Sequence, residues 1–186
     1  MGFDLKRVIR GRVWKFGDSI ETDAINPYYH YPAMEELKLH TMELYRPEFP
    51  REVKSGDIMI AGRNFGCGSS RPGLVLREVG IAAIIAESVA RLFLRNCISR
   101  AIPIFVAPGV TELVNDGEIL EVDYPNGVIV NPANGASLPL NKYPPAIEQI
   151  FECGGLLQFA YERYIREAAL VGRANLENGR GHEKVI

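Results

Sequence analysis

The sequence predicts an α/β fold with an antiparallel part added toward the C-terminus. Within residues 56–107, three short apolar runs alternate with two segments of helical pattern. Continuous apolar runs that glycines bound are typical of strands buried on both faces. Strands that alternate with helices pair in parallel through right-handed crossovers, so we expect a β-α-β-α-β series here.

The segments before this series predict a strand, a long loop and a helix. Residues 7–16 alternate enough for a strand or hairpin. Residues 17–36 form an irregular loop that Pro27 and Pro32 interrupt, and residues 35–45 fit a short helix.

The central series has three expected strands, at 56–62, 81–86 and 102–107. The glycines at 66 and 68 permit a sharp turn after the first strand, and Ser69 or Ser70 can cap the helix that follows. Pro72 is tolerated in a first helical turn, and Gly80 is placed to end this helix. A second helix is expected over 87–97.

The C-terminal part changes character. Residues 118–123 and 128–131 indicate an antiparallel hairpin, with Asn126-Gly127 as its turn signal. Residues 144–155 and 156–170 then fit helices. From residue 171 the chain is polar and glycine-containing, so we expect one domain over 1–170 and a loosely held polar tail over 171–186.

Composition limits the classes of function. The formal net charge is -2, which argues against a nucleic-acid-binding or membrane-surface protein. The N-terminal segment has no long apolar core, so we expect neither a signal peptide nor a membrane span. The three cysteines, Cys67, Cys97 and Cys153, lack the spacing of a zinc or iron–sulfur site, and they indicate reduced, buried thiols in a cytoplasmic protein.

The loop NFGCGSSR (64–71) is the first candidate site. It lies between a buried strand and a helix N-terminus, where unpaired N–H groups and the helix dipole favour an anion. Ser69, Ser70 and Arg71 would add hydroxyl donors and a two-pronged clamp for a carboxylate. A glycine-rich turn with a serine cap and a solvated arginine explains the same spacing, and the spacing alone does not choose between them.

Three further patterns stand beside it. The acidic segment GDSIETD (17–23) by itself favours a solvated turn. Arg91 and Arg95 lie four apart on one helical face, which is usually solvated unless an anion is shared. The polar-aromatic cluster at 28–31 either covers the edge of a core or faces a ligand; its members are Tyr28, Tyr29, His30 and Tyr31. The histidines at 30, 40 and 182 lack the spacing of a metal site.

Taken in order, the segments GDSIETDAINP, GDIMIAGRNFGCGSSR, GIAAIIAESVARLFLRN and IP resemble the swivelling domain of the aconitase superfamily. The resemblance covers residues 8–160. The chain resembles the small subunit of isopropylmalate isomerase, the small subunit of homoaconitase and the C-terminal domain of aconitase equally. It implies a three-layer β/β/α fold and a hydro-lyase subunit that acts on a small 2-hydroxy dicarboxylate. It also implies a hetero-oligomer with a large subunit that holds a [4Fe–4S] cluster, no cofactor on this chain, and no activity without that partner.

The resemblance assigns roles residue by residue. Ser69 matches the catalytic serine, whose alkoxide removes a proton beside a carboxylate, and the helix N-terminus and Arg71 would stabilise that alkoxide. Ser70 and Arg71 match residues that hold a substrate carboxylate. Asp23 matches an active-site aspartate that positions neighbouring charged groups. Arg91 and Asn96 match a family pattern whose role is either structural or to contact the residues that bind the substrate.

This chain departs from the family in places that bear on its substrate. It reads SSRPG (69–73) where relatives read SSRE, RNCISRAIP (95–103) for RNAINIGLP, and PYYHYPAME (27–35) where relatives carry a loop with an arginine. The fold and the reaction class survive these departures, but the identity of the substrate does not. By default the resemblance implies 3-isopropylmalate and leucine biosynthesis. Dimethylmalate dehydratase and homoaconitase remain as enzymatic alternatives. A non-catalytic binding module is an alternative of another class, disfavoured by the intact Ser69-Ser70-Arg71 motif and the near-neutral charge.

Overall fold

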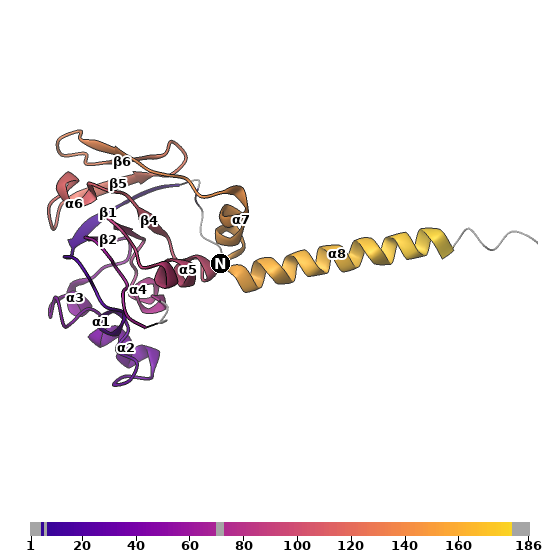
Figure 1. The fold of residues 1–186 in the computed structure, drawn as a ribbon, viewed down its shortest axis with the longest axis horizontal. Coiled ribbons are helices and arrows are strands. Elements are labelled where there is room, and N and C mark those ends of the chain that lie inside the picture. The colour runs from indigo at the N-terminus through magenta and orange to yellow at the C-terminus, as the bar shows by residue number, and fades with distance from the viewer. Residues whose placement is uncertain (1–4, 6, 70–72, 180–186) are drawn as a thin grey trace, which may run out of the picture.

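The computed structural model describes residue 5, residues 7–69 and residues 73–179, with the side chains of the last helix described up to residue 167. One seven-stranded sheet runs through the protein in the order β4-β3-β2-β1-β5-β6-β7 (Figure 1). Its strands are β1 (Val8–Lys15), β2 (Ile58–Ala61), β3 (Ala83–Ala86), β4 (Ile104–Val106), β5 (Ile119–Asp123), β6 (Val128–Val130) and β7 (Ser137–Pro139).

Four of the strands are parallel. β1 pairs with β2, β2 with β3, and β3 with β4, so the expected β-α-β-α-β series is confirmed and β1 extends it. Every residue of β2 and β3 is buried, as their unbroken apolar runs predict. Because the strands are parallel, their carboxyl ends meet at one edge of the sheet.

The other half of the sheet is antiparallel and starts from the opposite side of β1. β5 pairs with β1, and β5 and β6 form the predicted hairpin. Its turn spans residues 124–127, with Gly127 at φ +69° and its N–H bonded to the Tyr124 carbonyl over 3.1 Å. β7 was not predicted from the sequence; it has three residues and ends at Pro139 on the sheet edge, where proline is tolerated.

The helices are α1 (Thr22–Ile25), α2 (Met34–His40), α3 (Phe49–Glu52), α4 (Leu74–Glu78), α5 (Arg91–Ser99), α6 (Val110–Leu113), α7 (Pro145–Cys153) and α8 (Leu156–Gly179). α5 begins four residues later than predicted, because residues 88–90 are extended and bond to the loop after β2. α8 projects from the body of the domain as one helix (Figure 1). It runs through residue 171, so no helix end marks the predicted start of the tail.

Two apolar cores lie on the two faces of the parallel strands. Met59 and Ile84 face one core, which α1 to α5 cover, and Ile58 and Ile60 face the other. That second core also contains side chains of β5 and β6, among them Val122. The antiparallel half of the sheet therefore packs over one face of the parallel half, and helices cover the other face. This gives the three layers, β/β/α, that the family resemblance implies (Figure 1). In the described part of the chain, no helix has the length and apolar character needed to span a bilayer.

Gly66 provides a test of how tightly the loop after β2 is packed. It has φ +74°, and a Cβ atom at this position would lie 2.2 Å from the Phe93 side chain. Gly135 has nearly the same φ, +73°, but a Cβ there would meet nothing within 4 Å. We expect Gly66→Ala to lower the free energy of unfolding by about 1–3 kcal/mol more than Gly135→Ala, because only the first adds overpacking to backbone strain.

Urea denaturation of the two variants and the wild type measures this difference. Equal losses in the two variants would show that the loop can move away from Phe93 without cost.

Candidate active site

Three loops meet at the carboxyl edge of the parallel strands. They follow β1, β2 and β3 and span residues 16–21, 62–69 and 87–90. In open sheets of parallel strands, ligands bind at this edge, where loops from neighbouring strands converge. Of the described candidate residues, Ser69 lies on the second loop and Asp23 on α1, which follows the first. The third loop leads into α5, which carries Arg91 and Asn96.

The loops after β1 and β2 are joined by hydrogen bonds along their length. Asp18 Oδ1 accepts the N–H of Arg63 over 2.6 Å, and residues 21 and 67 form an isolated parallel bridge. Further backbone bonds run from Gly62 N to Gly17 O (3.0 Å), from Ser19 N to Arg63 O (2.7 Å), from Gly66 N to Ile20 O (2.8 Å) and from Thr22 N to Cys67 O (2.8 Å). The acidic segment 17–23 is therefore built into the site and is not simply a solvated turn.

The loop after β3 holds the loop after β2 from its other side. Phe65 N donates to Ser88 O over 3.0 Å, and Ala90 N donates to Phe65 O over 2.9 Å. The Asn64 N–H is capped by Ser88 Oγ at 2.8 Å. The segment that leads to Ser69 is thus fixed between two neighbours.

Ser69 is exposed, and its hydroxyl lies in a short chain of hydrogen bonds. Its N–H donates to Thr22 Oγ1 over 3.0 Å, and its Oγ donates to Asp23 Oδ1 over 3.2 Å. The Ser69 Oγ and Thr22 Oγ1 atoms are 3.1 Å apart. A serine hydroxyl has one hydrogen, and here it goes to Asp23, so Thr22 is the donor to Ser69 Oγ. Thr22 itself is fully buried, which fixes the donor in place.

This geometry corrects the expected surroundings of Ser69. α4 begins at Leu74, its N-cap is Gly73, and Ser69 bonds to Thr22 and Asp23 instead. Of the two serines expected as possible caps, Ser69 is therefore not the cap. Ser70, Arg71 and Pro72 lie outside the described residues. A carboxylate beside an alkoxide opposes a second negative charge, so a serine base at this position requires a nearby cation.

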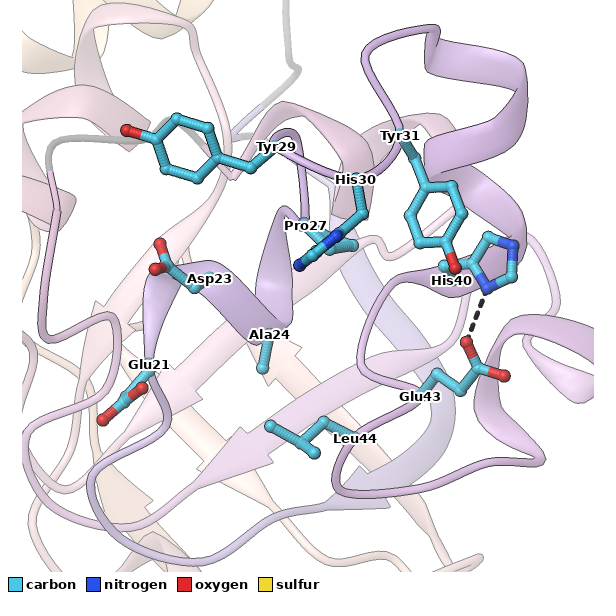
Figure 2. A pocket seen from close by; sticks show the side chains of 10 residues that line it. All are labelled: Glu21, Asp23, Ala24, Pro27, Tyr29, His30, Tyr31, His40, Glu43 and Leu44. Atoms are coloured by element: carbon cyan, nitrogen blue, oxygen red, sulfur yellow. Dashed lines mark hydrogen bonds and ion pairs between the residues drawn. The ribbon is translucent and has the colours of Figure 1, made fainter.

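A cavity of about 480 Å³ opens beside Asp23 (Figure 2). The structure brings Tyr29, His30 and Tyr31 of the predicted polar-aromatic cluster into its wall, and leaves Tyr28, which is 52% exposed, outside it. The complete lining is Glu21, Asp23, Ala24, Pro27, Tyr29, His30, Tyr31, His40, Glu43 and Leu44. Among these described residues there is no lysine or arginine, so the wall offers tyrosines, imidazoles and alkyl groups but no permanent positive charge.

Three residues of this region were not predicted from the sequence: Thr22, His40 and Glu43. Thr22 lies between Glu21 and Asp23, in a segment that was already a candidate, and only the long-range contact to Ser69 reveals its part. The sequence gives no signal for His40 and Glu43, because neither lies in a pattern with the spacing of metal ligands.

Arg91 and Asn96 lie on α5, directly after the loop that follows β3. Arg91 is the first residue of this helix and is exposed, whereas Asn96 is partly buried. Phe93, between them, is fully buried and packs edge-on against Phe65 at a centroid distance of 5.4 Å. α5 thus supports the loop that leads to Ser69, and a role of Arg91 and Asn96 in the reaction stays a prediction.

The cysteines of this chain are free thiols, and they do not fit a cluster site. Cys97 is fully buried, and burial raises its pKa to about 12, so it stays protonated at neutral pH. Burial and the neighbouring Glu162 carboxylate also raise the pKa of Cys153. Over the described part of the chain, no three His, Cys, Asp or Glu side chains gather as ligands for a metal ion.

The model of the aconitase C-terminal domain matches residues 6–107 of this sequence. The chain belongs to the aconitase C-terminal domain family. Its match to the family includes all three loops of the candidate site and all of the parallel strands.

Relatives in this family align over nearly their whole length. The 3-isopropylmalate dehydratase small subunit 1 of Archaeoglobus fulgidus is 47% identical over 163 residues, which cover 86% of this chain and 99% of the relative. The isopropylmalate/citramalate isomerase small subunit of Methanocaldococcus jannaschii is 45% identical, covering 83% of this chain and 95% of the relative. A crystal structure of 3-isopropylmalate dehydratase from the same organism superposes with a TM-score of 0.80 at 35% identity, covering 88% and 99%. The fold class predicted from the sequence is confirmed.

Proposed function

We propose that this chain is the small subunit of a heteromeric hydro-lyase that dehydrates and rehydrates a 2-hydroxy dicarboxylate, with 3-isopropylmalate as the default substrate. The observation that carries the proposal is the chain of hydrogen bonds from Thr22 through Ser69 to Asp23, beside a cavity at the carboxyl edge of the parallel strands. The names of the relatives support the reaction class and a large-subunit partner. In this proposal the reaction is a step of leucine biosynthesis.

In this reaction the Ser69 alkoxide accepts the proton from the carbon beside a substrate carboxylate and becomes a hydroxyl. The C–H electron pair forms the double bond, and the hydroxyl on the neighbouring carbon leaves with its bonding pair as hydroxide, which takes up a proton from solvent to become water. Ser69 returns its proton to solvent before the next turnover. The Thr22 donor stabilises the negative charge on the Ser69 alkoxide, and Asp23 accepts the hydrogen bond of the Ser69 hydroxyl once the proton has been taken up. Because Asp23 is itself an anion, the proposal assigns charge stabilisation and the holding of a carboxylate to Arg71, with Ser70.

The iron–sulfur cluster belongs to the large subunit in this proposal. It would supply a Lewis acid for the departing substrate hydroxyl, a task for which this chain has no suitable ligands among its described residues. This chain supplies the base, the orientation of that base, and one wall of the cavity. The three free thiols support a cytoplasmic site of action, where such thiols stay reduced.

The first test is reconstitution under anaerobic conditions with a cluster-bearing large subunit, followed by absorbance of the unsaturated diacid. We expect turnover from the pair and none from the isolated chain. Ser69→Ala should lower kcat of the pair by at least about 100-fold, the size of a general-base contribution, while leaving the subunits associated. Ser137→Ala, an exposed serine on β7, is the matched control and should have no effect.

Turnover by the isolated chain would refute the need for a partner. Near-normal kcat in Ser69→Ala would refute Ser69 as the base.

The second test concerns the substrate. The cavity wall contributed by residues 27–31 has no guanidinium, and tyrosines and imidazole pack well against alkyl groups. We expect the reconstituted enzyme to have a higher kcat/KM on isopropylmalate and dimethylmalate than on citrate and homocitrate. His30→Arg should raise the relative kcat/KM on homocitrate by about 10-fold or more, because one charge-assisted contact is worth about 1.5–3 kcal/mol.

Comparison of the four substrates on the wild type and on His30→Arg checks this expectation. A wild-type preference for citrate or homocitrate would contradict the proposed part of this loop.

A further inference from the structure

Three residues in the cavity wall form a unit that the proposed mechanism does not use. The rings of Tyr31 and His40 are stacked, with centroids 3.7 Å apart and planes at 5° (Figure 2). His40 Nδ1 lies 2.6 Å from Glu43 Oε2. All three residues line the cavity, and Figure 2 shows them together on one side of it, with Asp23 on the other.

The geometry of the stack indicates that Glu43 is needed to hold it. Aromatic rings prefer an offset or edge-on arrangement to a face-to-face one, so we infer that a nearly parallel pair at 3.7 Å needs a second restraint. A carboxylate can only accept, so His40 donates from Nδ1 and the Glu43 bond fixes the plane of the imidazole.

His40 and Glu43 are in turn held against α1, the helix that carries Asp23. Thr41, next to His40 and fully buried, donates its hydroxyl hydrogen to the Ile25 carbonyl over 2.7 Å. Met42 N donates to the Ala24 carbonyl over 2.8 Å. These two bonds keep the His40–Glu43 pair at a fixed distance from the other side of the cavity.

Tyr31 lies in the loop 26–33, which joins α1 to α2. Its N–H and that of His30 both donate to the Pro27 carbonyl, at 3.1 and 3.0 Å, so the backbone turns tightly here. Residues 28–30 are exposed, with Tyr29 at 81%, whereas Tyr31 packs partly against the core. Contacts with the core and with His40 therefore define the position of the Tyr31 ring.

We propose that His40 and Glu43 are positioning residues that hold the Tyr31 ring as a fixed wall, and that this wall selects the alkyl group of the substrate. The inference rests on the proposed function, because it takes a substituted malate as the ligand. The Tyr31 ring packs against the substituent, and its fixed position favours a branched alkyl group that fills the cavity over a smaller one. His40 and Glu43 act through Tyr31 and need not touch the reacting atoms.

Kinetics of the reconstituted enzyme test this selection. We expect His40→Ala and Glu43→Ala to raise KM for isopropylmalate about 10-fold, the range for loss of one apolar contact, with kcat little changed. The preference for isopropylmalate over dimethylmalate should fall in both variants. Glu43→Gln keeps an acceptor for Nδ1 and should restore the wild-type preference. Leu39→Ala, on the same helix and 63% exposed, is the control and should change neither value.

A second readout does not depend on activity. In the isolated chain, ring currents of His40 should shift the NMR signals of the Tyr31 ring, and this shift should be lost in Glu43→Ala and kept in Glu43→Gln. A Tyr31 signal that is unchanged in Glu43→Ala would overturn the positioning part. If the Tyr31 signal changes as expected but the ratio of kcat/KM for isopropylmalate to that for dimethylmalate does not, the selection of the alkyl group by Tyr31 is refuted. A wild-type pair that is inactive on every 2-hydroxy diacid would instead refute the proposed function and leave the positioning result standing.

Discussion

The pairing of the loop at 17–22 with the loop at 62–69 is the constraint on which the site depends. β1 and β2 are parallel neighbours, so their carboxyl ends are adjacent, and the two loops continue to bond beyond the sheet. At the end of this run, Thr22 accepts the Ser69 amide and donates to the Ser69 hydroxyl. The position of Ser69 is therefore set by a residue 47 positions earlier and not by the helix that follows it.

β1 makes this arrangement possible because it belongs to both halves of the sheet. It is parallel to β2 on one side and antiparallel to β5 on the other. Trp14 on β1 is buried and donates its indole N–H to Asp57 over 2.7 Å, which fixes the start of β2 against it. Burial would raise the pKa of Asp57, but Arg12, the Lys54 N–H and Trp14 together hold that pKa below its ordinary value. An ionised Asp57 thus ties β1 to the segment before β2.

The sequence predicted those parts of the molecule that depend on local patterns. The apolar runs of β2 and β3, and the glycines after β2, fixed the strand–loop–helix order, and the resemblance added roles for Ser69 and Asp23. Two features could not be predicted from the sequence. The three residues of β7 carry no strand pattern, and α5 starts late because Ser88 bonds to a distant loop. The Tyr31–His40–Glu43 unit was equally invisible, because a stack between a loop and the end of a helix leaves no periodic signal.

The central claim is that Thr22 positions Ser69, and amide hydrogen exchange at Ser69 tests it most directly. Ser69 is exposed, but its N–H is bonded to Thr22 Oγ1. This amide should therefore exchange more slowly than unbonded amides of exposed loops. Thr22→Val should accelerate exchange at Ser69 about 10-fold or more, since a bond worth about 1–1.5 kcal/mol is lost, whereas Thr22→Ser should leave it slow. The Cys67 amide, which bonds to the Ile20 carbonyl, should not change in either variant. Equal exchange at Ser69 in the wild type and in Thr22→Val would contradict the account.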